Sequence, residues 1–119
     1  GFVIAENDAG TVSNNLATNN GFGGFRLTIN EGMISGNTAD GNNGRGFFIT
    51  NNNGQLVGNT AKENSGDGFA FEFQDNVTSE ISDNRSTSNG GAGFNLNGNS
   101  PASASGNTAS ENVLGNEVP

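Results

Sequence analysis

The chain has 119 residues and a net charge of −8, with 12 acidic and four basic residues. This acidity argues against nucleic-acid backbones and anionic membrane surfaces as partners, and no apolar run is long enough to insert into a membrane. Cysteine and histidine are absent. Their absence excludes a disulfide framework, thiolate or imidazole metal ligands, and a Ser-His or Cys-His catalytic pair within this chain.

A repeat of 22 to 25 residues runs through the whole chain. Its first marker is an Asn, often within Gly-Asn-Thr, and a second Asn follows five residues later. A Phe stands ten residues after the first Asn in four units. The first Asn is Asn15, Asn37, Asn59, Asn84 or Asn107, the second is Asn20, Asn42, Asn64, Asn89 or Asn112, and the Phe is Phe25, Phe47, Phe69 or Phe94, with Phe2 ahead of the first unit. Abundant Gly and Asn would also suit a disordered chain, but disorder does not impose such regular spacing.

Each unit contains three short segments in which apolar or small residues alternate with polar ones, and this alternation predicts strands. The segments have the forms Phe-x-aliphatic, small-x-aliphatic and Thr-Ala-x. In chain order they cover 2–4, 10–12 and 16–18; 25–27, 32–34 and 38–40; 47–49, 54–56 and 60–62; 69–71, 79–81 and 85–87; and 94–96, 102–104 and 108–110. One unit cannot bury its apolar side chains alone, whereas stacked units form a continuous narrow core.

These features predict an all-β fold, a single-stranded right-handed parallel β-helix of about five coils that forms one domain over residues 1–119. The right hand follows from the usual handedness of connections between parallel strands. Gly and Asn are expected at the corners, where they tolerate left-handed backbone conformations. Equivalent Asn side chains, including Asn37, Asn59 and Asn107 at one corner, are expected to form hydrogen-bonded ladders between coils.

The stretch "ISGNTADGNNGRGF" from Ile34 to Phe47 resembles the repeats of the pectate-lyase-like superfamily, including NosD-type and related extracellular repeat proteins. The likeness extends from Gly1 to about Asn112. It implies the β-helix fold but no single activity, because lyases, hydrolases, tailspikes, adhesins and scaffolds share this coil. The resemblance also implies that catalysis, where it occurs, uses Arg or Lys as a base with carboxylates that hold Ca²⁺, or several carboxylates on one strand face.

Residues at the same offset in successive coils should lie side by side, so catalytic groups can be sought by offset. The outward position after each Phe gives Val3, Arg26, Phe48, Ala70 and Asn95, and the next outward position gives Ala5, Thr28, Thr50, Glu72 and Asn97. Neither series stacks two carboxylates, as acid–base chemistry would need. The weak catalytic candidates are therefore Glu72, Asp75, Glu80 and Arg85, around the longest connection; solvated loop charges are the simpler interpretation.

Two turn sequences are weak candidates for Ca²⁺, which binds six to eight oxygen ligands. They contain Asp40 in one coil and Glu63 with Asp67 in the next. Plain corner turns explain the same residues. No other cofactor is expected.

The expected function is a non-catalytic structural or adhesive element located outside the cell or on its surface. The chain starts on a core strand and shows no capping segment, so we expect either a segment of a longer rod or a subunit that stacks end to end into a filament. The expected partners are further copies of the chain and polysaccharide. The alternative is a fragment of a carbohydrate-active β-helix protein, such as a polysaccharide lyase, a hydrolase or a tailspike-like binding protein. The sequence leaves enzymatic activity open, with no enzyme as the favoured interpretation.

Overall fold

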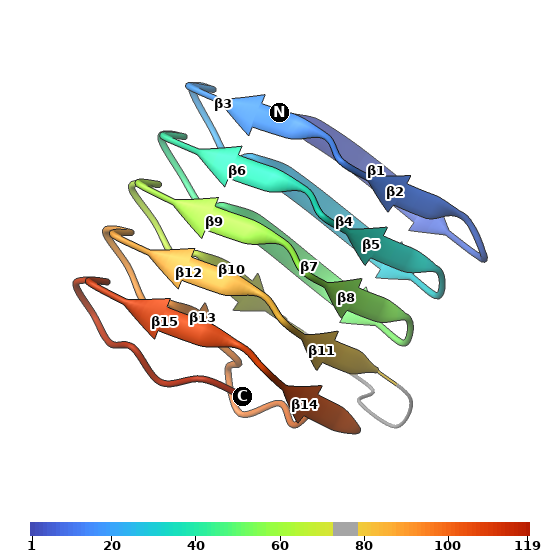
Figure 1. The fold of residues 1–119 in the computed structure, drawn as a ribbon. Coiled ribbons are helices and arrows are strands. Elements are labelled where there is room, and N and C mark those ends of the chain that lie inside the picture. The colour runs from blue at the N-terminus through green and yellow to red at the C-terminus, as the bar shows by residue number, and fades with distance from the viewer. Residues whose placement is uncertain (73–78) are drawn as a thin grey trace.

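The computed structural model describes residues 1–72 and 79–119, which form a solenoid of stacked coils (Figure 1). Three parallel sheets of five strands each form its walls, and each coil contributes one strand to every sheet. The predicted parallel β-helix of about five coils is therefore confirmed. Among the described residues, no helix is long and apolar enough to cross a membrane.

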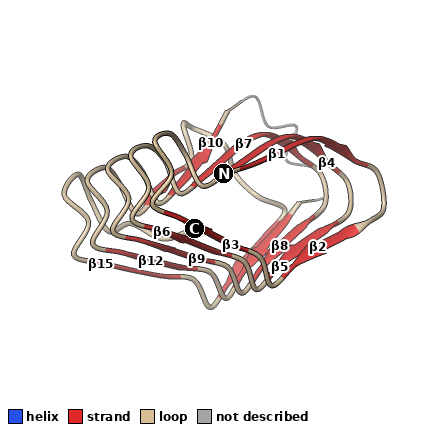
Figure 2. Ribbon diagram, turned by 90° about the horizontal axis from the view of Figure 1, so that it is seen from above, coloured by secondary structure: helices blue, strands red, loops and turns tan. Residues whose placement is uncertain are grey.

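Three sides of each coil are strands, and turns join them at the corners (Figure 2). The first sheet consists of β1 (Phe2–Asn7), β4 (Phe25–Asn30), β7 (Phe47–Asn52), β10 (Phe69–Phe71) and β13 (Phe94–Asn95). The second consists of β2 (Thr11–Ser13), β5 (Met33–Ser35), β8 (Gln55–Val57), β11 (Glu80–Ser82) and β14 (Ser103–Ser105). The third consists of β3 (Leu16–Thr18), β6 (Thr38–Asp40), β9 (Thr60–Lys62), β12 (Arg85–Thr87) and β15 (Thr108–Ser110).

In the core, each buried residue packs against the residue at the equivalent position of the neighbouring coil. Rings of the five core Phe residues stack along the first sheet, with centroids 4.8 to 4.9 Å apart and nearly parallel planes. Aliphatic residues form a second column, in which Ile34 pairs with Leu56, and alanines form a third, in which Ala39 pairs with Ala61. The ring spacing follows the distance between hydrogen-bonded strands, about 4.8 Å.

Two predicted asparagine ladders are present, at the corner before the third sheet and at the corner after it. In both, the Oδ1 atom of one Asn accepts hydrogen bonds from the backbone N–H and the Nδ2 group of the Asn one coil earlier. At Asn59, for example, Oδ1 receives the N–H of Asn37 at 2.9 Å and its Nδ2 at 3.0 Å. A third ladder, which the sequence analysis did not identify, links Asn7 to Asn30 and Asn30 to Asn52 at 2.7 Å each.

The left-handed residues at these corners are not the ladder asparagines themselves. They are the residues immediately before them, such as Gly58 (φ 65°) before Asn59 and Glu63 (φ 54°) before Asn64. Glu63, Ser88 and Glu111 adopt positive φ although their side chains disfavour it, and Asp83 adopts it with a side chain that tolerates it better. The expectation that Gly and Asn would occupy these positions therefore holds for only some of the coils.

The segment after Asn112 continues the last coil for a few residues. Gly115 forms a parallel bridge with Ala92, and the Oδ1 atom of Asn116 accepts both the N–H and the Nδ2 of Asn112 at 2.9 Å. In the rest of this ladder, the acceptor for each Asn is the Asn of the next coil. For Asn112 the acceptor is Asn116, four residues later in the same coil. The sequence pattern fades in this region, and this local cap of one ladder was not foreseen.

Candidate functional site

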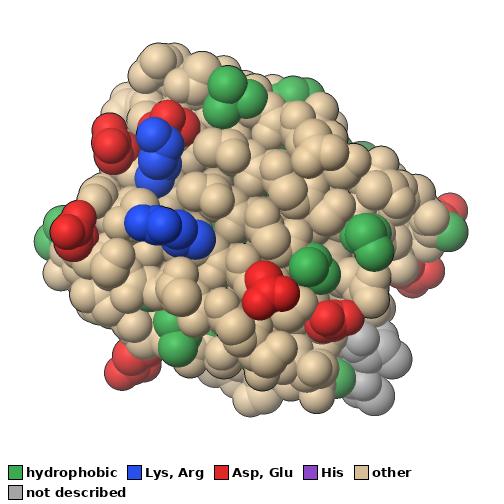
Figure 3. Space-filling model, in the orientation of Figure 1, with side chains coloured by type: hydrophobic (Ala, Val, Ile, Leu, Met, Phe, Trp, Pro, Cys, Tyr) green, Lys and Arg blue, Asp and Glu red, His purple; other side chains and the backbone are tan. Residues whose placement is uncertain are grey.

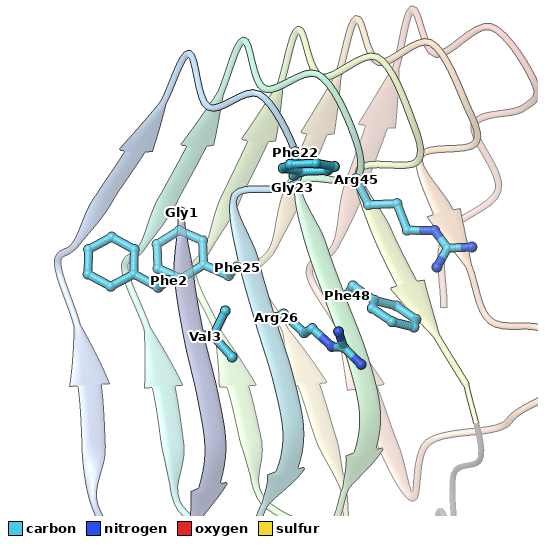
Figure 4. Close-up of a pocket in the computed structure, with 9 residues that line it drawn as sticks. All are labelled: Gly1, Phe2, Val3, Phe22, Gly23, Phe25, Arg26, Arg45 and Phe48. Carbon is cyan, nitrogen blue, oxygen red and sulfur yellow. The ribbon is translucent and has the colours of Figure 1, made fainter.

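The outer face of the first sheet carries a row of side chains that differs from the rest of the repeat. Strand pairing places Val3 beside Arg26 and Arg26 beside Phe48, as the offset analysis predicts. All three project away from the stacked core rings of Phe2 and Phe25 (Figure 4). Two of the four basic residues of the chain, Arg26 and Arg45, gather around this row.

Phe48 lies between the two guanidinium groups. The Cζ atom of Arg45 is 4.5 Å from the centroid of the Phe48 ring, and that of Arg26 is 5.8 Å from it. Both distances suit cation–π attraction, which holds a guanidinium group against a ring while its N–H groups remain able to bind a ligand. The ring therefore restrains two cationic donors on one face of the sheet.

Two carboxylates balance the charge of Arg45. Its Nε atom is 3.9 Å from Asp67 Oδ2, and its Nη1 atom is 3.6 Å from Glu72 Oε1. Asp67 is itself fixed, because its oxygens accept hydrogen bonds from the N–H of Ala92 at 2.8 Å and from Asn95 Nδ2 at 3.0 Å. Arg26, by contrast, forms no ion pair with any described residue.

A hollow of about 440 Å³ lies over this row (Figure 4). Its rim includes Phe22, whose side chain is 87% exposed. Aromatic rings, an arginine without an acidic partner and an open hollow together can bind a ligand that has both flat apolar surfaces and anionic groups. We call Arg26, Arg45 and Phe48, with Phe22 at the rim, the arginine–phenylalanine face.

The residues predicted as weak catalytic candidates do not come together. Glu72 follows β10 at the edge of the first sheet, Glu80 lies in β11 of the second, and Arg85 lies in β12 of the third. Glu80 accepts hydrogen bonds from Gln55 Nε2 at 2.8 Å and from Ser82 Oγ at 2.9 Å. Asp75 is outside the described residues. Among the described members of this set, Glu72 is the one near a cationic side chain on the arginine–phenylalanine face.

The candidate Ca²⁺ ligands have other roles in the structure. Asp40 in β6 binds Lys62 in β9, with Oδ2 to Nζ at 2.9 Å, and the hydrogen bond to this carboxylate is the main cause of a raised pKa of Lys62. Glu63 occupies a left-handed corner, and the oxygens of Asp67 bind Ala92 and Asn95. Within residues 1–72 and 79–119, no group of three or more acidic side chains is arranged to hold a metal ion.

The other two sheets form a plainer surface. Figure 3 shows the side on which the second and third sheets lie, where most of the surface is neither charged nor hydrophobic, acidic side chains are scattered, and two basic side chains lie next to each other. Strand residues there include Ser13, Ser35, Thr38 and Thr60, which alternate with the buried core positions. The hydrogen-bonding groups on this surface are spread along the strands and do not gather at one site.

Part of the arginine–phenylalanine face was predictable from the sequence, and the rest was not. Arg26 and Phe48 share an offset, so their adjacency was predicted. Arg45 precedes the strand and reaches the ring by folding over it, and Phe22 belongs to a turn, so neither contact follows from strand offsets. The sequence carries no signal for these residues, since Arg45 is as near in sequence to Lys62 as it is to Arg26.

Comparison with known proteins adds information at the level of the fold. A family model described as "right handed beta helix region" matches residues 1–116. No curated protein and no solved structure matches the chain. The family match fixes the predicted right-handed winding of the solenoid and agrees with the resemblance to pectate-lyase-like repeats. A chain whose five coils stack in three parallel sheets, and which this model matches almost throughout, belongs to the right-handed β-helix family.

Proposed function

We propose that this chain is a non-catalytic structural and adhesive part of a β-helical rod outside the cell or on its surface, and that its arginine–phenylalanine face binds acidic polysaccharide. The observation that carries the proposal is the Arg26–Phe48–Arg45 arrangement on an otherwise uniform solenoid. The core columns and the asparagine ladders are accounted for by the stacking of coils.

The chemistry of the face suits a sugar acid. A pyranose ring has an apolar face that packs against an aromatic ring, and its carboxylate can accept paired hydrogen bonds from a guanidinium group. The net charge of −8 opposes an anionic ligand at long range, but Arg26 has no acidic partner among the described residues, so its charge is available to a ligand at short range. The parallel strands repeat at about 4.8 Å, which gives an extended chain of sugars a regular surface to follow.

The non-catalytic part of the proposal rests on how the carboxylates are used. Asp67 is occupied by two hydrogen bonds and Glu80 by two others. Glu72 lies beside Arg45 and favours the second candidate, a carbohydrate-active fragment that cleaves the polysaccharide it binds. A single set of variants separates the two candidates.

The test measures binding of the chain to polygalacturonate and to a neutral glucan by isothermal titration calorimetry. We expect binding to the acidic polymer alone. Arg26→Gln or Phe48→Ala should weaken it on the order of tenfold, since each removes a charged hydrogen bond or a stacking surface of about 1.4 kcal/mol or more. Arg85→Gln on the third sheet is the matched control and should bind like the parent chain.

Equal binding by Arg26→Gln and the parent chain would overturn the proposed face. Shortening of the polymer during incubation, lost in Glu72→Gln, would favour the carbohydrate-active fragment over the non-catalytic element. Failure of the parent chain to bind either polymer would contradict both.

A further inference from the structure

We propose that Asn97 is a site of spontaneous covalent modification, where the Asn97–Gly98 step closes to a succinimide and opens to aspartate or isoaspartate. Asn20 and Asn89, which begin two of the other four Asn-Gly steps, are held in an asparagine ladder. This inference concerns the covalent stability of the solenoid and is independent of ligand binding.

The reaction needs an asparagine followed by a residue whose backbone nitrogen can approach the side chain. The deprotonated backbone nitrogen of Gly98 attacks Cγ of Asn97, and the bond from Cγ to Nδ2 breaks as ammonia leaves with a proton from water. Water then adds to either ring carbonyl and opens the ring to aspartate or isoaspartate. Glycine favours the attack because it has no Cβ and moves freely. No electrons are exchanged, and water is the only co-reactant.

The chain contains five Asn-Gly steps that would be equally reactive in an unfolded peptide. They are Asn20–Gly21, Asn43–Gly44, Asn53–Gly54, Asn89–Gly90 and Asn97–Gly98. Asparagine is among the thermolabile residues of proteins, so differences among these five must come from the fold.

Asn97 is the least restrained of the five. It lies in the turn between β13 and β14, is exposed, and has a φ of 50°. Its side chain and the N–H of Gly98 form no hydrogen bond with any described residue. Apart from the two neighbouring residues in the chain, no atom lies within 4 Å of the position that a Cβ of Gly98 would take, so the ring has room to close.

Asn89 is held at every atom that would have to move. It is fully buried, and its Nδ2 donates to Asn112 Oδ1 at 2.8 Å, to Ser86 Oγ at 3.0 Å and to the carbonyl of Ala61 at 3.1 Å. The attacking nitrogen, that of Gly90, donates to the carbonyl of Asn64 at 2.8 Å. Ring closure there first requires local opening of the ladder, which costs several buried hydrogen bonds.

The other three steps lie between these extremes. The N–H of Gly54 donates to the carbonyl of Asn30 at 2.9 Å, and Asn20 Nδ2 donates to Asn42 Oδ1 at 2.7 Å. Asn43 is exposed, but a Cβ at Gly44 would meet the backbone N of Gly23 at 3.1 Å, so the Gly44 backbone rests on the preceding coil. The expected order is therefore Asn97 first, Asn43 second and Asn89 last.

The experiment incubates the full chain at mildly alkaline pH, which favours the deprotonated nucleophile, and follows each step by peptide mapping with mass spectrometry. Fragmentation that distinguishes isoaspartate from aspartate identifies the product. We expect Asn97 to react on the order of tenfold or more faster than Asn89, because the protected step must first break buried hydrogen bonds. Asn97→Gly, which tolerates the positive φ, should abolish the major product and leave the unfolding transition unchanged.

The same incubation in concentrated urea provides the matched control. There the rates at Asn97 and Asn89 should converge, because no ladder remains. Equal rates in the folded chain, or no reaction at Asn97, would overturn the proposal. An Asn89 that stays slow in urea would show that its sequence, and not the ladder, protects it, and would equally overturn the proposal.

Discussion

At the scale of single residues, the side chains of the ladder asparagines supply hydrogen bonds of the kind that backbone groups supply in a sheet. A side-chain amide has the same donor and acceptor as a peptide group, so it can satisfy the buried polar atoms that a tight corner would otherwise leave unpaired. Asn59 illustrates the density of these bonds. Its Nδ2 donates to Asn84 Oδ1 at 3.0 Å and to the carbonyl of Ile34 at 2.9 Å, and its Oδ1 accepts two bonds from Asn37.

Asn59→Ala should therefore destabilise the fold strongly. The change leaves the N–H of Asn37 without an acceptor in a buried site, at a cost of roughly 1–3 kcal/mol, and removes the side-chain donor to the carbonyl of Ile34. We expect the free energy of unfolding in urea, followed by circular dichroism, to fall by about 3 kcal/mol or more. Asn43→Ala is the matched control at the corner surface and should change it by less than about 0.5 kcal/mol. A loss below about 1 kcal/mol for Asn59→Ala would contradict the structural role of the ladder.

At the scale of the strand and its corner, glycine has two separate tasks. Gly58 precedes a ladder asparagine at a φ of 65°, and a Cβ placed on it would meet no atom within 4 Å. Gly46 precedes the core ring of Phe47 without positive φ, and a Cβ there would lie 2.7 Å from the carbonyl oxygen of Gly68 and 2.8 Å from Ala61 Cβ. The first glycine is needed for its conformation and the second for its small size.

Alanine substitutions should separate these two tasks. Gly58→Ala should cost about 1 kcal/mol of unfolding free energy, the penalty of a left-handed residue with a side chain. Gly46→Ala should cost about 2 kcal/mol or more, because the neighbouring coil must move to relieve a clash with backbone atoms. Urea titrations of the two variants, compared under identical conditions, test this order. If Gly58→Ala were the more destabilising of the two, the backbone conformation at the corners would matter more than the close contact between neighbouring coils.

The accuracy of the sequence analysis also differs between elements. Coil number, strand order and two ladders were predictable, because each depends on like residues that recur at one offset. The third ladder, Asn7, Asn30 and Asn52, stands five residues after Phe2, Phe25 and Phe47, but the fourth coil has Gln74 at that offset, so the Asn series is interrupted in the sequence and was not recognised. The contact of Arg45 with Phe48 was not predictable from offsets, since a long side chain can reach over a neighbouring strand.

At the scale of the whole molecule, the repeat creates two opposing tendencies. The three strands of each coil form backbone hydrogen bonds with the strands of the next coil. Strands at an end of the stack have unpaired N–H and C=O groups, which can pair with a coil from the same polypeptide or from a second copy. The ring of Phe2 in β1 stacks one face on Phe25, with ring centroids 4.9 Å apart, and Phe2 is 39% exposed. The net charge of −8 acts against association of two copies.

Association of copies through this edge, which we propose as part of the structural role, should therefore increase with salt. Screening shortens the reach of the repulsion to about 8 Å at physiological ionic strength and leaves the stacking of rings and strands intact. Light scattering across a range of protein concentrations should show growth of assemblies that is stronger at high salt, whereas binding of acidic polysaccharide to Arg26 should weaken at high salt.

Phe2→Asp, which places a charge in the ring stack, should suppress the growth of assemblies, and Val3→Asp on the outer face is the matched control. A chain that stays monomeric at all concentrations and salt levels would contradict association, and equal growth of Phe2→Asp and Val3→Asp would show that copies meet through another surface.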